Sequence, residues 1–139
     1  MTDITVPSIA EIEADMRSKV KPGKELFYSL KTNGENEAKA YARKHGLHTI
    51  WDYLDKEILE KGNIGQSQEY FESASIAYAK VVTGKTYVLL DGDPSKNSKS
   101  WAAGTIWDTV EWPELEKRSD VQVYRISPSM DPSHGVQIH

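Results

Sequence analysis

The segment from Lys85 to Leu90 constrains the fold more than any other part of the sequence, because its last four residues, Tyr87-Val88-Leu89-Leu90, are all apolar or aromatic. A strand with one solvent face alternates polar and apolar side chains, whereas a continuous apolar run is typical of an interior strand covered on both faces. The patterns over 25–29 and 121–126 predict two further strands. Residues 136–138 are expected to pair briefly near the C-terminus.

Helical patterns precede and separate these strands. We expect helices over 9–19, 35–45, 50–61 and 67–82. Thr49 is expected to cap the third of them, and 63–66 is expected to form a loop. Strands that alternate with helices predict an α/β fold with a small, mainly parallel sheet flanked by helices. Ligands of such sheets bind beyond the carboxyl ends of the strands, here near Tyr28-Ser29, the loop after Leu90 and the region near Ser127.

The length of 139 residues fits one domain with a substantial core. We expect a single domain over 1–139, with an N-terminal helix and turn over 1–22, a core over 25–127 and an irregular tail over 128–139. The absence of cysteine excludes disulfides, thiolate zinc sites and a thiol nucleophile. A net charge of −4, with scattered lysines and arginines, argues against nucleic-acid binding.

Membrane and targeting signals are absent from the sequence pattern. No apolar run approaches the roughly 20 residues of a membrane span, and no basic segment followed by an apolar run marks a signal peptide. We therefore expect no membrane segment. The expected location is the cytoplasm, or the outside of the producing cell for a delivered effector whose signal has been removed. The four histidines form no metal-binding pattern, so no metal site is expected.

Three of the four tryptophans fall within the stretch from Ser98 to Leu115. Glu111 lies between Trp107 and Trp112 in this stretch. Indole faces beside a carboxylate suit a flat, partly apolar, cationic ligand, because positive charge is attracted to both groups. The plain structural alternative is that the tryptophans belong to the core and that Glu111 is a surface residue on a turn.

Several segments resemble, in order and spacing, the catalytic half of the ADP-ribosyl cyclase and NAD glycohydrolase family. Leu26-Phe27-Tyr28-Ser29 is similar to the family's L-W-S segment, and 49–54 (T-I-W-D-Y-L) resembles T-L-E-D-T-L. The segment 70–90 resembles a family helix carrying F-A followed by V-M-L-N-G, and 110–115 resembles V-E-V-x-N-L. The resemblance covers 26–126. It implies an ADP-ribosyl cyclase-like fold in a minimal form, without the family's disulfides or its helical N-terminal half.

The resemblance also implies roles for individual residues. Glu111 matches the family's catalytic glutamate. Tyr28 and Phe71 fall at, or next to, the two tryptophans that sandwich nicotinamide, and Trp107 matches a phenylalanine near the diphosphate and the nicotinamide ribose. Trp51 replaces a family glutamate that helps to decide between cyclised and hydrolysed product. The implied substrate-binding set is Tyr28, Ser29, Trp51, Phe71, Ser75, Thr105 and Trp107.

The phosphate-binding positions are partly different from the family's. Ser29 and Ser75 match hydroxyls near the substrate's phosphates. Leu30 falls where an arginine often touches phosphate, so phosphate binding must come from another residue. Tyr28 and Phe71 also fit plain core positions, and serines are common at strand ends and in helix first turns, so a structural interpretation stays open for all of these side chains.

The resemblance implies a NAD glycohydrolase that releases nicotinamide and ADP-ribose, with some cyclic ADP-ribose. For a cysteine-free minimal domain that consumes NAD, we expect a role as a toxin or effector. In NAD the ring nitrogen of the nicotinamide group is already positive, so a carboxylate that stabilises the oxocarbenium-like ribose can suffice without a general acid. NAD is then the substrate, no cofactor is expected, and a protein partner is unknown. The alternative is a non-catalytic module that binds a nucleotide or a protein in the same pocket. Transfer of ADP-ribose to a protein stays open, and a ribonuclease toxin lacks the histidine pair or basic groove it would need.

Overall fold

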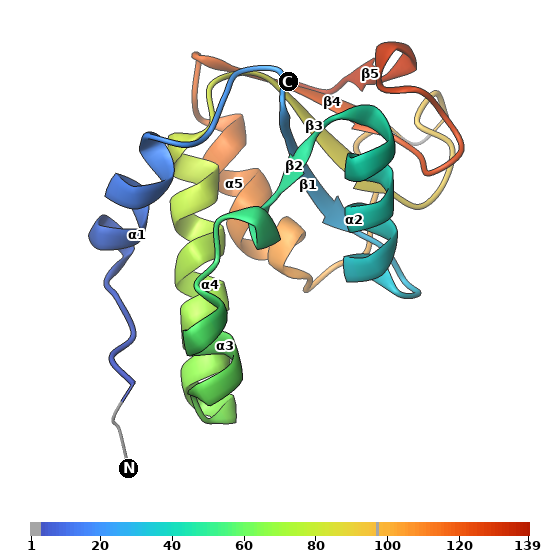
Figure 1. The fold of residues 1–139 in the computed structure, drawn as a ribbon. Coiled ribbons are helices and arrows are strands. Elements are labelled where there is room, and N and C mark those ends of the chain that lie inside the picture. The colour runs from blue at the N-terminus through green and yellow to red at the C-terminus, as the bar shows by residue number, and fades with distance from the viewer. Residues whose placement is uncertain (1–3, 97) are drawn as a thin grey trace.

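The computed structural model describes residues 4–96 and 98–139, which form a sheet with helices on both faces (Figure 1). The strands are β1 (Glu25–Ser29), β2 (His48–Thr49), β3 (Gly84–Leu90), β4 (Val121–Ile126) and β5 (Val136–Gln137). Their order in the sheet is β2-β1-β3-β4-β5. The first four strands pair in parallel and β5 pairs antiparallel with β4. This arrangement confirms the expected α/β class with a small, mainly parallel sheet.

The sheet separates two apolar layers. The helices are α1 (Ile9–Arg17), α2 (Gly34–His45), α3 (Lys56–Lys61), α4 (Ile64–Val81) and α5 (Trp112–Glu116). On β3, Val88 and Leu90 face the layer of α1, α4 and α5, while Tyr87 and Leu89 face the layer of α2. Successive side chains of a strand point to opposite faces, so a strand in the middle of the sheet needs apolar residues throughout. Figure 1 shows α2 on the side of the sheet away from α1 and α4.

Two of the predicted helices differ from the structure. The helix expected over 50–61 is broken: β2 pairs with β1, a short 3-10 turn, η1 (Ile50–Asp52), follows, and α3 begins only after Asp55, whose carboxylate accepts a hydrogen bond from the Glu57 N–H. The 63–66 segment is not a loop but the start of α4, because the Asn63 side chain accepts a hydrogen bond from the Gln66 N–H. A reciprocal bond from the Asn63 N–H to the Gln66 side chain completes a capping box.

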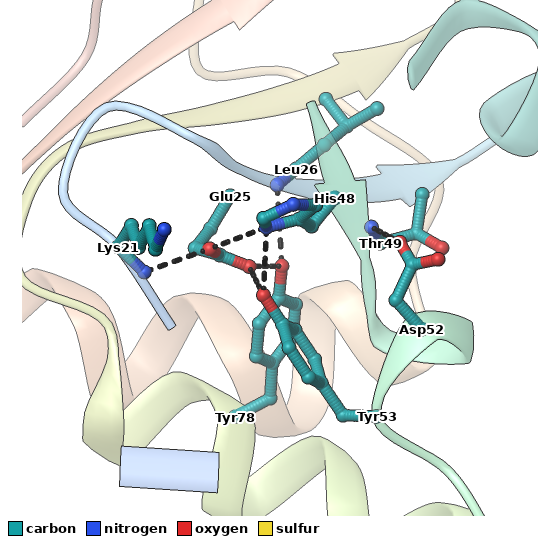
Figure 2. Close-up of polar contacts among 8 residues, drawn as sticks. All are labelled: Lys21, Glu25, Leu26, His48, Thr49, Asp52, Tyr53 and Tyr78. Carbon is teal, nitrogen blue, oxygen red and sulfur yellow. Dashed lines mark hydrogen bonds and ion pairs between the residues drawn. The ribbon is translucent and has the colours of Figure 1, made fainter. Parts of the chain in front are cut away.

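The amino end of β1 is fixed by Glu25, whose side chain is buried (Figure 2). Oε1 accepts hydrogen bonds from the hydroxyls of Tyr53, at 2.6 Å, and Tyr78, at 3.0 Å. Oε2 accepts one from the Lys21 N–H, at 3.0 Å, and lies 3.2 Å from Nδ1 of His48. This buried carboxylate is therefore fully partnered, and it ties β1 to α4 and to the segment after β2. Nothing in the sequence singled it out.

Candidate active site

A pocket of about 200 Å³ lies at the carboxyl end of β1, where the sequence predicted ligand binding. Four segments that are distant in the sequence build it: β1 with the residue after it, η1, α4, and the segment around η2 (Trp107–Glu111). The residues that line it are Leu26, Phe27, Tyr28, Ser29, Leu30, Ile50, Phe71, Tyr78, Ile106, Trp107 and Glu111. The pocket is mostly apolar and aromatic, with few polar groups, as is typical of small-molecule sites.

Glu111 enters this pocket from a π-helical turn. In η2 the N–H of Trp112 bonds to the carbonyl of Trp107, which widens the helix by one residue before α5 begins. Such turns are rare and occur frequently at functional sites. No pattern in the sequence indicated this turn. Glu111, which the plain structural alternative placed on the surface, is only 6% exposed.

The carboxyl group of Glu111 has no charged or hydrogen-bonding partner within 4–96 and 98–139. Burial alone raises its pKa from 4.5 to about 8, because the charged form loses its hydration and gains nothing in exchange. A buried, unpartnered carboxyl group reduces stability, and strongly perturbed groups of this kind in a pocket are typical of functional sites. The contrast with fully partnered Glu25 distinguishes the two buried glutamates.

One wall of the pocket is formed by the aromatic side chains of Tyr28 and Phe71, and both of them contact Trp51. Trp51 donates a hydrogen bond from Nε1 to the Tyr28 hydroxyl, at 2.8 Å, and its ring centroid lies 5.1 Å from that of Phe71. Lys39 Nζ lies 4.9 Å from the centroid of the Trp51 ring. Burial raises the pKa of Tyr28 to about 12, so its hydroxyl keeps its proton at neutral pH. Trp51 lines a neighbouring groove rather than the pocket of Glu111, and it acts on the pocket through Tyr28.

Two side chains close to the pocket have buried polar atoms without a hydrogen-bond partner in the described part of the chain. Trp107 is 1% exposed, and its Nε1 has no hydrogen-bond acceptor in the described part of the chain. Ser75 Oγ is buried and likewise without a partner there. Ser75 lies four residues after Phe71 and three before Tyr78, so it shares the face of α4 that lines the pocket. Buried polar atoms are almost always paired in native proteins, so these exceptions require an explanation.

A second pocket, of about 380 Å³, adjoins the first and shares Ser29 and Leu30 with it. Thr105 and Trp101 line it from the segment before η2. Among the residues that the structure describes, Lys31 is the one cationic side chain that lines either pocket. It directly follows Leu30, the position at which the resemblance leads one to expect an arginine.

The structure thus brings Tyr28, Ser29, Phe71, Trp107 and Glu111 around one pocket. Of the remaining predicted residues, Thr105 lies in the adjoining pocket, Trp51 is one hydrogen bond away, and Ser75 is buried on the α4 face between two lining residues. Their roles toward a ligand stay predictions. The apolar lining residues Ile50, Ile106 and Tyr78 were missed, because nothing in their sequence context separates pocket lining from core.

The described residues form neither a metal-binding cluster nor a membrane-spanning helix. Within residues 4–96 and 98–139, no three histidine, aspartate or glutamate side chains are grouped so as to hold a metal ion. Over the same part of the chain, no helix combines the length and apolar character that crossing a bilayer requires.

Solved structures with the same fold are ADP-ribosyl cyclases. The chain matches a crystal structure of Aplysia cyclase complexed with the substrate NGD and the product cGDPR, with a TM-score of 0.56 and 21% identity over 78% of this chain and 50% of that one. It also matches an ADP ribosyl cyclase complexed with N1-cIDPR, with a TM-score of 0.56 and 20% identity over 78% of this chain and 51% of that one.

No protein-family model and no curated protein sequence matches the chain. The chain spans about half the length of the cyclases that it resembles. At this level of identity the likeness concerns the backbone and not the activity. The sheet and helices of this chain have the ADP-ribosyl cyclase-like fold that the sequence segments predicted.

Proposed function

We propose that this protein is a NAD glycohydrolase, which cleaves the bond between nicotinamide and ribose and releases nicotinamide and ADP-ribose. The observation that carries the proposal is Glu111, a buried carboxyl group with no partner in the described chain, in an aromatic pocket at the carboxyl end of a parallel strand. The structures with the same fold are cyclases bound to NGD, cGDPR and N1-cIDPR, which are nucleotide ligands of related chemistry.

The charge state of Glu111 fits a cationic substrate. With a pKa of about 8, most of the free protein holds a neutral carboxylic acid at pH 7. A pyridinium ring placed beside it lowers that pKa, because an opposite charge at close range favours the ionised form. Binding of the substrate thus generates the carboxylate where it is needed, out of water, and an ion in such surroundings has a stronger field than one in solvent.

Bond cleavage then moves positive charge from the ring to the ribose. The electron pair of the glycosidic bond goes to the ring nitrogen, neutral nicotinamide departs, and the ribose becomes oxocarbenium-like. A fixed carboxylate stabilises this state more than the ground state, in which the charge lies on the ring. Water adds to the sugar carbon and releases one proton to the solvent, which gives ADP-ribose. Glu111 accepts hydrogen bonds from the ribose hydroxyls and holds the sugar in place.

The two adjoining pockets fit the two parts of the substrate. The Glu111 pocket, with the wall of Tyr28 and Phe71, accepts nicotinamide and its ribose, and the adjoining pocket of Lys31 accepts the ADP portion. Together their volumes fall within the ~300–1,000 Å³ typical of small-molecule sites. NAD is the substrate in this account and no cofactor takes part. Because Trp51 replaces the family glutamate, we expect hydrolysis as the main outcome and cyclic ADP-ribose as a minor one.

The test incubates NAD with the wild type, with Glu111→Gln and with a matched control, and uses chromatography to measure the nicotinamide that each protein releases. Glu116→Gln is the control because this glutamate lies on the next helix with its side chain in solvent. Turnover by the wild type and Glu116→Gln, with loss in Glu111→Gln, supports the proposal. Equal turnover in all three rejects the role of Glu111, and no turnover in any of them rejects the activity.

The second candidate is a non-catalytic module that binds a nucleotide in the same pockets. Two replaced positions favour it, namely Trp51 in place of the family's glutamate and Leu30 in place of its arginine. Titration with NAD and with ADP-ribose, with the thermal unfolding temperature as the readout of binding, separates the two functions. Stabilisation by NAD without any release of nicotinamide identifies the module.

A further inference from the structure

Arg125 is a buried cationic side chain near the carboxyl end of β4, and it is 1% exposed. It follows Val121 and Val123 at two-residue spacing, so it lies on the face of the sheet that α1, α4 and α5 cover. Both valines belong to the apolar core on that face. A guanidinium group loses its hydration there at a cost in free energy, so its place must be explained by the groups that it holds.

The guanidinium group of Arg125 holds the main chain at two points. Nη1 donates a hydrogen bond to the Ser100 carbonyl, at 2.7 Å, and Nη2 donates one to the Asp91 carbonyl, at 2.6 Å. Asp91 directly follows β3, and Ser100 directly precedes Trp101. The two bonds therefore close the chain between β3 and the tryptophan cluster into a loop with fixed ends.

Both fixed ends lie at the adjoining pocket of about 380 Å³. The chain at either end of the loop supplies most of the lining residues, namely Leu90, Asp91 and Gly92 at the first end and Trp101, Ala102 and Thr105 beyond the second. At Gly92, where φ is +94°, the chain passes so close to Arg125 that a Cβ atom would lie 3.5 Å from Nη2. The position of Arg125 thus determines how far apart these two parts of the pocket lie.

The remaining part of the pocket is tied to the same point. Asp91 Oδ2 accepts a hydrogen bond from the Lys31 N–H, at 2.8 Å, and Lys31 lines the pocket from the segment after β1. Arg125 therefore fixes the main chain of Asp91, and the side chain of Asp91 fixes Lys31. Arg125 itself is not one of the lining residues of either pocket, so it acts through the chain that it holds.

We infer that Arg125 is a positioning residue that keeps the adjoining pocket formed before a ligand binds, and that it thereby strengthens binding of the ADP portion of the substrate. The identity of that ligand rests on the proposed function. A pocket that is already formed binds more tightly, because its loops need not be ordered at the moment of binding. Arginine suits this role because its planar group presents several donors in fixed directions, whereas the lysine ammonium is a compact group on a flexible stem.

The experiment compares the wild type with Arg125→Lys and Arg125→Met, each as the whole chain. Lysine keeps the charge without the planar group, and methionine donates no hydrogen bond but suits the apolar face of the sheet. Arg118→Lys is the matched control, since Arg118 also donates to a main-chain carbonyl, that of Ala79, but lines neither pocket. The readouts are kcat and KM for NAD, and the affinity for ADP measured by calorimetry.

Arg125→Lys should raise KM for NAD and weaken ADP binding about tenfold, which is the lower range for one hydrogen bond to a charged group, and Arg125→Met should do so more strongly. In both variants kcat should stay nearly unchanged, because the chemical step takes place in the pocket of Glu111. Arg118→Lys should match the wild type in all three quantities.

An unchanged affinity for ADP in either Arg125 variant, a loss of kcat without a change in KM, or an equal loss in Arg118→Lys would overturn the inference and leave the proposed function in place. Failure of both Arg125 variants to fold would also overturn it, because the role would then be structural. If the wild type releases no nicotinamide from NAD, the proposed function fails and the ADP titration decides the inference. Weaker ADP binding in the Arg125 variants alone then supports it, and a wild type that binds no ADP contradicts it.

Discussion

Ionisation of Glu111 should make the stability of this protein fall steeply as the pH rises. Its pKa is about 8 in the folded protein, against 4.5 in an open chain. Between these values the folded state binds more protons than the unfolded state, so the free energy of unfolding decreases with increasing pH. Between pH 5 and pH 8 this one group costs about 3.5 kcal/mol, a large share of the stability of a small domain.

Glu111→Gln removes the ionisation and leaves a side chain of the same shape. The buried amide has a desolvation cost of its own, but that cost is the same at every pH. The difference in unfolding free energy between the variant and the wild type should therefore grow by about 3.5 kcal/mol from pH 5 to pH 8, in favour of the variant.

Urea unfolding at pH 5 and pH 8 measures this difference, provided that the slope with urea is unchanged between variants. Glu116→Gln, which alters a solvent-exposed carboxylate on the neighbouring helix, should follow the wild type at both pH values. If Glu111→Gln and the wild type show parallel pH dependences, the carboxyl group is not held in an unfavourable environment and the reasoning fails.

Three further predictions concern the residues around this site. Trp51→Phe removes the hydrogen bond to the Tyr28 hydroxyl but keeps an aromatic ring in contact with Phe71. KM for NAD should therefore rise about fivefold while kcat stays nearly unchanged, and an unchanged KM would show that the bond does not position Tyr28. Lys31→Ala should weaken binding of ADP-ribose and leave that of nicotinamide unaltered, as measured by calorimetry, and equal loss for both ligands would exclude a role in phosphate binding. Glu25→Ala leaves the Tyr53 and Tyr78 hydroxyls without their acceptor, so urea unfolding should show a loss of roughly 3 kcal/mol, whereas a loss below 1 kcal/mol would mean that this cluster does not hold β1 in place.

The hydrophobic pattern of the sequence predicted the main strands of the sheet and their bounds. The strands expected over 25–29 and 121–126 have the same bounds in the structure, and β3 begins one residue before Lys85. These segments are short and strongly patterned, and each is bounded by turn residues, so local sequence decides them. The start of α4 could also have been predicted, since Asn63 and Gln66 have the spacing of a capping box, but 63–66 was expected to form a loop.

The details of the site depended on tertiary packing that no local pattern records. The π-helical turn that carries Glu111 begins at Trp107, whose ring packs with those of Trp101 and Trp112 at centroid distances of 5.2–5.8 Å within the group. Residue spacing in the sequence cannot show that a turn is widened by one residue. In the same way, Trp51 and Tyr28 are 23 residues apart, and their hydrogen bond exists only because β1 and β2 pair. The resemblance named Tyr28, Phe71 and Glu111 together, and the structure shows that these residues line one pocket.

The central claim is that an ionised Glu111 drives cleavage of a cationic nucleotide, and the pH profile of nicotinamide release from NAD tests it most directly. The ratio kcat/KM reports the ionisation of the free protein. It should rise with pH through an apparent pKa near 8, the value that burial gives to Glu111, and Glu111→Gln should show no turnover at any pH. A profile that is flat between pH 5 and pH 9 in the wild type, or turnover that survives in Glu111→Gln, would contradict the account.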